Sequence, residues 1–369
     1  MSDGGTGRLG VLGGGQLGRM MGLEGRPLGV EFRFYDPSSE AAAKQLGELV
    51  VGDFDDLEAL KRFADGVDVV TYEFENVPVA SAEFLSQQVK VFPPPAALAN
   101  TQDRLIEKQF LFDLGIPVAP FRAVDDLPSL QESVVAIGLP AVLKTRTLGY
   151  DGKGQVVLRT QAHVERAWPA LQGRPLIVEQ FVPFDQEASI VGVRGQSGTA
   201  FYPLVANVHR DGILHVTRAP GGFSAALQAE AERHLNKLFD AFGYVGVCTI
   251  EFFVVGESLV VNEVAPRVHN SGHWTIEGAA TSQFANHVRA VLGLPLGSTR
   301  PLGPSTMVNI IGALPRVADL LALDGVYLHL YGKRPRPGRK LGHVTIAHLS
   351  ESETERRLAD VLAIVDGAR

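Results

Sequence analysis

Two glutamates on neighbouring apolar segments are the first residues of this sequence whose types and spacing suggest chemistry. Residues Cys248–Val255 and Leu259–Val264 are apolar and β-branched, so they are predicted to be strands joined by a loop at 256–258. A three-residue loop places Glu251 directly opposite Glu263, whereas a two-residue loop places Glu263 on the other face. Two facing carboxylates repel each other unless a cation lies between them, so the pair predicts a Mg²⁺ site. The alternative is that each glutamate lies on a solvated face and meets an arginine.

A dense run of polar side chains follows the second of these strands. Between positions 267 and 273 the sequence has Arg267, His269, Asn270, Ser271 and His273. Such a density of polar groups directly after a buried strand is unusual for a plain connection, whereas loops positioned by strands commonly bind ligands. The run therefore favours the metal-site interpretation.

A glycine-rich turn near the N-terminus suggests a nucleotide. Gly13, Gly15 and Gly18 follow the apolar strand Arg8–Leu12 with the spacing G-x-G-x-x-G, and Asp36 comes where a ribose-binding acid would be. By itself this pattern indicates NAD, and a nicotinamide-dependent oxidoreductase is the main alternative from another functional class. Any tight turn from strand to helix near a ligand also needs these glycines, so the pattern is weak evidence.

A second glycine-rich stretch has a different setting. Gly149–Gln155 lies between an apolar strand at 139–145, which ends near Lys144, and a strand at 156–159. No Ser or Thr follows Lys153 and no helix opens after it, so this is not a P-loop. A glycine hairpin with a lysine on each side can fold over a polyphosphate with its N–H groups aimed at the oxygens. The alternative is a mobile hairpin tip with a solvated lysine.

Charged residues elsewhere extend this pattern. The loop at 71–76 follows a strand and carries Glu73, where open α/β sheets place ligand groups or where a turn simply faces solvent. Glu179 on the strand at 176–181, with Glu187 shortly after, suggests an adenine slot and a ribose anchor. Five cations at 333–340 in an acidic protein indicate a phosphate or another anionic partner, unless the run is merely solvated.

Composition limits the possible classes of protein. A length of 369 residues predicts two or three domains, and 45% apolar with 20% charged residues is ordinary for a globular protein. The net charge of −7 argues against a nucleic-acid partner. The single cysteine, Cys248, excludes a disulfide framework and a cysteine-based zinc site. Without a long apolar run or a signal peptide, we expect a cytoplasmic protein with no membrane partner.

The positioning elements follow a recognisable order. A small α/β unit is expected up to the break at Phe92–Pro95, followed by one helix over 96–114. The lysine, the glycine hairpin, the strand with Glu179 and the paired glutamates come next. This order resembles the ATP-grasp superfamily over nearly the whole chain. The motifs GGGQLGRMM, YEFENV, KTRTLGYDGKGQ, NEVAPRVHNSGHWT and GRKLGH resemble those of the 5-(carboxyamino)imidazole ribonucleotide synthases.

The resemblance implies an α/β fold of three domains. These are an N-terminal Rossmann-like pre-ATP-grasp domain (1–98), a central ATP-grasp domain (99–298) with a lid at about 120–182, and a small β-rich C-terminal domain (299–369). It also implies a homodimeric ligase of purine biosynthesis. This ligase would use ATP, bicarbonate and Mg²⁺ (or Mn²⁺) to carboxylate 5-aminoimidazole ribonucleotide, and would release ADP and phosphate.

The resemblance also implies roles for individual residues. ATP would contact Arg104, Lys144, Gly149, Tyr150, Asp151, Gly152, Lys153, Gly154, Gln155, Glu179, Gln180, Phe181, Val182, Glu187, His209, Asn262 and Glu263. Mg²⁺ would be held by Glu251 and Glu263. The catalytic groups around bicarbonate and the carboxyphosphate formed from it would be Arg267, His269 and Asn270, with Lys153, Asp151 and Tyr150 from the lid. The aminoimidazole nucleotide would meet Gln16, Leu17, Glu73, Tyr150 and Asp151, with Lys333, Arg339 and Lys340 on its phosphate.

Two further alternatives are weighed at this point. The formate-using glycinamide ribonucleotide transformylase is a close relative, but it lacks the Tyr150-Asp151 pair ahead of Gly-Lys-Gly-Gln and has Asp in place of Asn270. A cofactor-binding regulatory protein without catalysis would be favoured only if Glu251 and Glu263 bind no metal.

Overall fold

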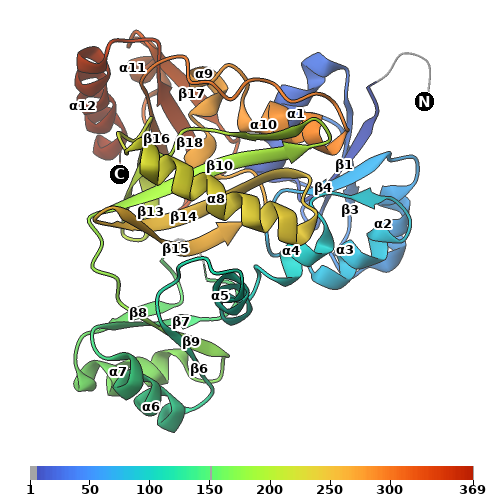
Figure 1. The fold of residues 1–369 in the computed structure, drawn as a ribbon. Coiled ribbons are helices and arrows are strands. Elements are labelled where there is room, and N and C mark those ends of the chain that lie inside the picture. The colour runs from blue at the N-terminus through green and yellow to red at the C-terminus, as the bar shows by residue number, and fades with distance from the viewer. Residues whose placement is uncertain (1–5, 150–151, 369) are drawn as a thin grey trace.

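The computed structural model describes residues 6–149 and 152–368, which form three β-sheets with flanking helices (Figure 1). The N-terminal sheet has the strand order β3-β2-β1-β4-β5, and all of its paired strands are parallel. Parallel pairing follows from the alternation of short apolar strands with helices, because each helical connection returns the chain to the end of the sheet where the previous strand began. Its strands are β1 (Arg8–Leu12), β2 (Glu31–Asp36), β3 (Glu48–Val51), β4 (Val69–Tyr72) and β5 (Lys90–Val91). Its helices are α1 (Gln16–Gly25), η1 (Arg26–Leu28), α2 (Leu57–Ala64) and α3 (Val79–Ser86).

The helix expected over residues 96–114 is wrong as a single element. The structure has α4 (Pro95–Ala99) and α5 (Arg104–Asp113), separated by a break at 100–103. Asp103 causes the new start, because its carboxylate accepts hydrogen bonds from the N–H groups of Leu105 and Ile106. The same carboxylate pairs with Arg146 at 2.7 Å, so the break fixes α5 against the strand that carries Lys144.

A small lobe extends from the body at the bottom of Figure 1. Its antiparallel sheet has the order β6-β9-β7-β8 and packs through apolar residues against two helices. The elements are β6 (Phe121–Val124), α6 (Leu127–Ile137), β7 (Ala141–Thr145), β8 (Gln155–Leu158), α7 (Gln161–Leu171) and β9 (Leu176–Gln180). The second glycine stretch connects β7 to β8, as the sequence predicts.

The largest sheet runs through the centre of the molecule in the order β15-β14-β10-β12-β13-β16-β18-β17, with β11 paired to β10. Its first half comprises β10 (Gln186–Gly195), β11 (Gly198–Phe201), β12 (Val205–Arg210), β13 (Ile213–Ala219), β14 (Gly246–Val255) and β15 (Ser258–Ala265). The C-terminal strands β16 (Ser305–Ile311), β17 (Val326–Leu330) and β18 (Lys340–Ile346) continue this sheet through the β13–β16 pair. The C-terminal unit is therefore β-rich, as expected, and shares one sheet with the central unit.

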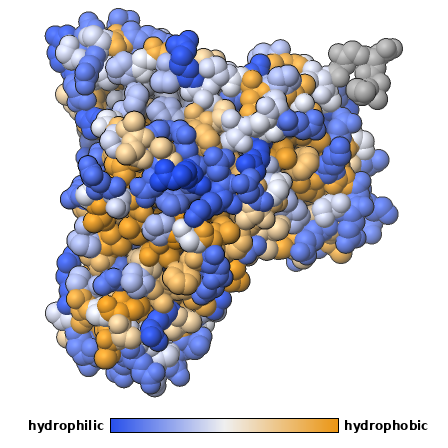
Figure 2. Space-filling view, in the orientation of Figure 1, coloured by the Kyte–Doolittle hydropathy of each residue, from blue (hydrophilic) through white to orange (hydrophobic). Residues whose placement is uncertain are grey.

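Helices cover the central sheet and complete the fold. They are α8 (Ala225–Phe242), η2 (Asn270–Gly272), α9 (Thr275–Gly278), α10 (Gln283–Val291), α11 (Val317–Leu321) and α12 (Glu351–Gly367). The apolar face of α8 packs on β10, β14 and β15 around residues such as Leu235, Phe239 and Ile250. Hydrophilic residues gather across the middle of the face in Figure 2, above the small lobe. Across the described ranges, no helix has the length and apolar content that crossing a membrane requires.

Candidate active site

Two adjoining cavities lie where the three sheets meet. One has a volume of about 360 Å³ and is lined by residues of the N-terminal unit, of β15 and of the C-terminal basic run, which is the cationic segment 333–340. The other, of about 280 Å³, lies between the small lobe and the central sheet. Arg104, Glu263, His269, Asn270 and Lys340 line both cavities. Ligands bound in the two cavities would therefore meet at this shared set of charged and polar groups.

The hairpin of β14 and β15 brings the two predicted carboxylates together. Glu251 pairs directly with Glu263, which confirms the predicted pairing. The predicted three-residue loop is wrong, because Val255 pairs with Ser258 and the loop is shorter. A β-bulge beside Glu251 compensates for the shorter loop. Phe252 pairs with Val261 and Glu251 with Glu263, so Asn262 is the extra residue. The bulge shifts the register by one residue and returns Glu263 to the face of Glu251.

The electrostatics of this pair fit a divalent cation. Burial and the neighbouring charge of Glu263 raise the pKa of Glu251 from 4.5 to about 7. Two side chains of the protein lie close to the pair: Arg104 Nη2 is 3.8 Å from Glu263 Oε2, and the His269 ring nitrogen Nε2 is 3.3 Å from Glu251 Oε1. No group of three or more His, Cys, Asp or Glu side chains with a metal-binding arrangement occurs in residues 6–149 and 152–368. The protein's donor set for a hard cation is thus two carboxylates, and phosphate oxygens would complete the coordination.

Lys108 is a buried lysine that supports the site and that the sequence analysis missed. Its ammonium is buried and donates to the backbone carbonyls of Val261, at 3.0 Å, and Asn262, at 2.7 Å. These carbonyls belong to the bulge, so Lys108 holds the irregular backbone that positions Glu263. Burial would raise the pKa of Glu179, but Lys108 at 3.6 Å and Lys144 at 3.0 Å hold it at about 2. The only signal in the sequence is that Lys108 lies on the same face of helix α5 as the apolar Leu111.

Most of the residues predicted to contact ATP line the cavity beside the small lobe. These are Arg104, Lys144, Gly152, Lys153, Gln155, Glu179, Gln180, Phe181, Val182, Glu187, His209, Asn262 and Glu263, together with Glu251. Glu187 Oε2 lies 2.7 Å from His209 Nδ1, which orients both side chains. Arg104 donates to the carbonyl of Gly149 at 2.7 Å and so fixes the start of the glycine loop. Gly154 lines neither of the two cavities, and Tyr150 and Asp151 lie outside the described residues.

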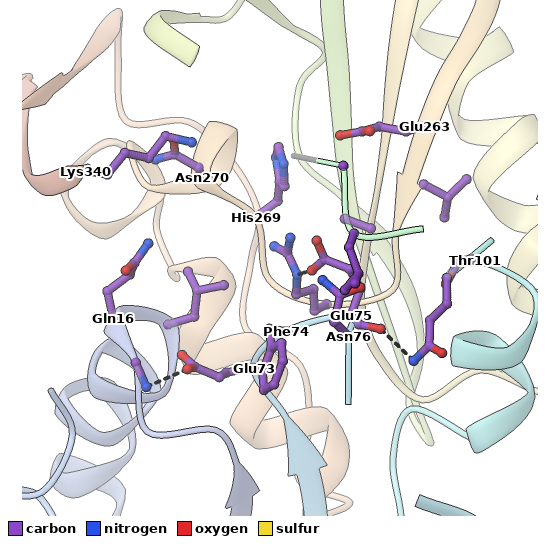
Figure 3. Close-up of a pocket in the computed structure, with 18 of the residues that line it drawn as sticks. Gln16, Glu73, Phe74, Glu75, Asn76, Thr101, Glu263, His269, Asn270 and Lys340 are labelled. Carbon is purple, nitrogen blue, oxygen red and sulfur yellow. Dashed lines mark hydrogen bonds and ion pairs between the residues drawn. The ribbon is translucent and has the colours of Figure 1, made fainter. Parts of the chain in front are cut away.

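The glycine N–H groups of the N-terminal turn are hydrogen-bonded within the protein. Glu73 accepts hydrogen bonds from the N–H groups of Gly15 and Gly18, and Asp36 Oδ2 accepts from Gly14 at 2.8 Å. The glycine turn and Asp36, the two parts of the apparent dinucleotide pattern, are therefore bonded to each other inside the protein. Glu73 still borders the larger cavity, where Figure 3 shows it below Gln16 and opposite Glu263 and His269.

The remaining predicted residues line the larger cavity, with one exception. Gln16, Leu17, Gly149, Arg267 and Lys333 line it alongside Glu73 and the shared residues. Lys333 donates to Gln16 Oε1, which joins the C-terminal basic run to the N-terminal turn. Arg339 lines neither of the two cavities and donates to the carbonyl of Arg334 at 3.3 Å.

Glu75 lines the larger cavity and Asn309 bonds to Asn270, and the sequence analysis assigned neither residue a role. Burial would lower the pKa of Arg267, but the ion pair with Glu75 raises it, so this guanidinium stays charged. Asn309, on β16, exchanges two amide hydrogen bonds with Asn270, at 2.7 and 3.0 Å. Glu75 belongs to the 71–76 loop that the sequence singled out, whereas no local pattern distinguishes Asn309.

Comparison with known proteins agrees with this geometry. Family models match residues 7–102 (ribonucleotide synthetase preATP-grasp domain), 109–284 (ATP-grasp domain) and 305–357 (phosphoribosylaminoimidazole carboxylase C-terminal domain). The N5-carboxyaminoimidazole ribonucleotide synthase of Pseudomonas aeruginosa is 51% identical over 360 residues, covering 97% of this chain and 99% of that protein. The chain belongs to the N5-carboxyaminoimidazole ribonucleotide synthase family. It is an ATP-grasp ligase of purine biosynthesis, and the oxidoreductase alternative is wrong.

Solved structures of the N5-carboxyaminoimidazole ribonucleotide synthase family support the same assignment. The Thermus thermophilus synthetase is 55% identical with a TM-score of 0.93, covering 97% of this chain and 98% of that chain. The Aspergillus clavatus enzyme, in complex with ADP and 5-aminoimidazole ribonucleotide, is 34% identical with a TM-score of 0.92. That alignment covers 98% of this chain and 99% of that chain.

Proposed function

We propose that this chain uses ATP to carboxylate 5-aminoimidazole ribonucleotide with bicarbonate, and releases ADP and phosphate. The observation that carries the proposal is the meeting of two cavities at Glu263, His269, Asn270 and Lys340. The cavity beside the small lobe would hold ATP, and the larger cavity would hold the nucleotide. A carboxyl group activated at the junction would then be within reach of an amine bound in the larger cavity.

In the first step, a bicarbonate oxygen attacks the γ-phosphorus of ATP. The bond between the γ-phosphorus and the β,γ-bridging oxygen breaks, which yields ADP and carboxyphosphate. Both reactants are anionic, so the step requires nearby positive charge. Lys144 and Lys153 line the ATP cavity, while Arg267 and Lys340 line the nucleotide side. These four cations would screen the repulsion between bicarbonate and the phosphates.

In the second step, the substrate's exocyclic amine attacks the carboxyl carbon of carboxyphosphate. A carbon–nitrogen bond forms, the bond from that carbon to the phosphate oxygen breaks, and the amine loses a proton as phosphate leaves. Arg267, His269 and Asn270 would surround the carboxyl group. Carboxyphosphate is lost to water, so the glycine loop beginning at Gly149, with Lys153, would act as a lid over the site.

A divalent cation, Mg²⁺ or Mn²⁺, would be held by Glu251 and Glu263. When bound, it would supply positive charge to the transferred phosphoryl group. The carboxylate pair, with its raised Glu251 pKa, is what supports this assignment. We further propose a cytoplasmic homodimer with no membrane or nucleic-acid partner.

We also propose domain limits at residues 1–98, 99–298 and 299–369, with the lid at about 120–182. The family-model ranges 7–102, 109–284 and 305–357 support these limits. Lys333 and Lys340 are proposed to bind the substrate phosphate, with Arg339 as a more distant contributor. Gln16, Leu17 and Glu73 would border the base and ribose, and Tyr150 and Asp151 would meet the nucleotide from the lid.

The test is ADP release with Mg-ATP and 5-aminoimidazole ribonucleotide, with bicarbonate present or carefully removed. We expect ADP release that depends on bicarbonate and is accompanied by an acid-labile carboxylated nucleotide. ADP release that ignores bicarbonate but follows formate and glycinamide ribonucleotide would contradict the proposal and favour the transformylase reaction.

A further inference from the structure

A chain of buried hydroxyl and amide groups leads from the interior of the central sheet to the ring of His269. Thr217 on β13 donates through its hydroxyl to Asn207 Oδ1 at 2.9 Å. Asn207 Nδ2 donates to Ser189 Oγ at 2.8 Å, and Ser189 Oγ donates to Ser271 Oγ at 2.8 Å. Ser271 Oγ lies 2.9 Å from His269 Nδ1. The hydroxyl-bearing members Thr217, Ser189 and Ser271 are fully buried.

The direction of these hydrogen bonds fixes the proton on the imidazole. Because Ser189 donates to Ser271 Oγ, the hydroxyl proton of Ser271 is available for His269 Nδ1. The backbone N–H of Ser271, which can only donate, lies 3.3 Å from the same nitrogen. Nδ1 thus faces two donors and carries no proton. The single proton of a neutral His269 ring must therefore be on Nε2.

The other ring nitrogen faces the place where the two cavities meet. His269 lines both cavities, and its Nε2 lies 3.3 Å from Glu251 Oε1. Because Nδ1 accepts from Ser271 and carries no proton, the one N–H group of the ring is at Nε2. An N–H group at this point can donate to a carboxylate or phosphate oxygen.

We infer that Ser271, Ser189 and Asn207 are positioning residues that hold His269 as the Nε2–H tautomer, so that it donates a hydrogen bond to bicarbonate or carboxyphosphate. The inference deepens the proposed function and rests on it for the identity of the bound oxygen. A fixed donor stabilises negative charge without reorganising during the reaction. It cannot take up a proton at Nε2, so His269 is not the base that deprotonates the substrate amine.

The tautomer is measured directly by ¹⁵N NMR of protein labelled at histidine. The sequence has ten histidines, so the His269 signals are assigned as those absent from His269→Gln. We expect a pyrrole-type shift for Nε2 and a pyridine-type shift for Nδ1. A pyrrole-type Nδ1, or a fully protonated ring, would overturn the inference. This measurement requires no turnover, so its outcome is independent of whether the proposed reaction is correct.

Removing the hydroxyls tests whether the chain positions His269. Ser271→Ala should populate the other tautomer and lower kcat about tenfold, as loss of an outer hydrogen-bond partner commonly does, while the KM for ATP changes less than twofold. Ser189→Ala should also lower kcat, and it provides a second variant if Ser271→Ala does not fold. Thr345→Val is the matched control. Thr345 is fully buried, and its hydroxyl has no hydrogen-bond partner within the described ranges.

A double-mutant cycle separates positioning from general packing. Glutamine can place an amide N–H near the position of Nε2, so His269→Gln should retain more activity than His269→Leu. Once glutamine replaces the ring, no tautomer remains to be fixed, so adding Ser271→Ala should cost less than twofold in kcat. Two results would overturn the inference: unchanged kcat in both serine variants, or fully additive losses in the double variant.

Discussion

Two kinds of carboxylate lie within the same active site, and they differ in which groups neutralise them. Glu73 accepts from two backbone N–H groups, and Glu179 faces two lysines, so the protein itself supplies their partners. Glu251 and Glu263 face each other, and burial with mutual repulsion raises the pKa of Glu251 to about 7. A carboxylate whose partners are internal is expected to hold the structure together, whereas we propose that the pair that repels is completed by a ligand. The predictions below test this distinction.

The largest expected effect is on the pair of carboxylates that face each other. Glu263→Gln should lower kcat by about a thousandfold, or about 4 kcal/mol, because the proposed cation, which would screen phosphoryl transfer, would lose a ligand. ATP analogues should still bind weakly, as isothermal titration would show. Glu257→Gln, in the exposed loop of the same hairpin, is the control and should keep its kcat. A near-normal rate in Glu263→Gln would remove the metal assignment.

For Lys108, which pairs with Glu179 inside the protein, we expect the main loss in stability. Lys108→Met should lower the free energy of unfolding by about 3 kcal/mol, because it leaves Glu179 with one cation fewer and two bulge carbonyls without their donor. Urea unfolding measures this change. Lys237→Met is a matched control, since Lys237 also donates to two backbone carbonyls, those of Leu114 and Gly115, but from the surface. Equal losses in the two variants would contradict the structural role of Lys108.

Loss of the Glu73 charge should also reduce stability more than activity. In Glu73→Gln one of the two N–H groups, of Gly15 or Gly18, would face an amide NH₂ instead of an oxygen. The expected loss is about 1–3 kcal/mol of unfolding free energy. Glu83→Gln, on the exposed surface of α3, controls for charge removal. If Gly15 and Gly18 were ligand groups instead, the substitution would leave unfolding unchanged and would weaken nucleotide binding only.

The raised pKa of Glu251 makes a signed prediction about pH. Its pKa moves from 4.5 to about 7 on folding, so between these values the native state binds more protons than the unfolded state. The free energy of unfolding should therefore fall as pH rises through this window in the metal-free protein. Glu251→Gln should remove this fall, which the difference between the two urea-unfolding profiles measures. Added Mg-ATP should reduce the fall in the wild-type protein, and an unchanged profile would contradict cation binding at the pair.

The sequence predicts the fold and the residue types of the site better than their partners. The β-branched pattern predicted the strands of the hairpin and the pairing of Glu251 with Glu263, although the loop length that supported it was wrong. The bulge at Asn262 could not be predicted, because it depends on Lys108, which is more than 150 residues away in the chain. The glycine pattern suggested NAD because the partner of its N–H groups, Glu73, is also distant in the chain. Spacing shows that N–H groups are exposed by a turn, but not that Glu73 occupies them.

The smallest expected effect concerns the cations on the nucleotide side, and it extends the comparison to positive charge. Lys333 borders the larger cavity and bonds to Gln16, whereas Arg336, in the same basic run, lines neither of the two cavities. Lys333→Ala should raise the KM for the nucleotide about tenfold, or about 1.4 kcal/mol, because the substrate phosphate would lose the charge-assisted hydrogen bond that we propose for Lys333. Its effect on the KM for ATP should be less than twofold, and Arg336→Ala should change neither constant. A larger change in the KM for ATP would move Lys333 from the substrate phosphate to the ATP side. Equal effects of the two variants would mean that the run acts through its overall charge.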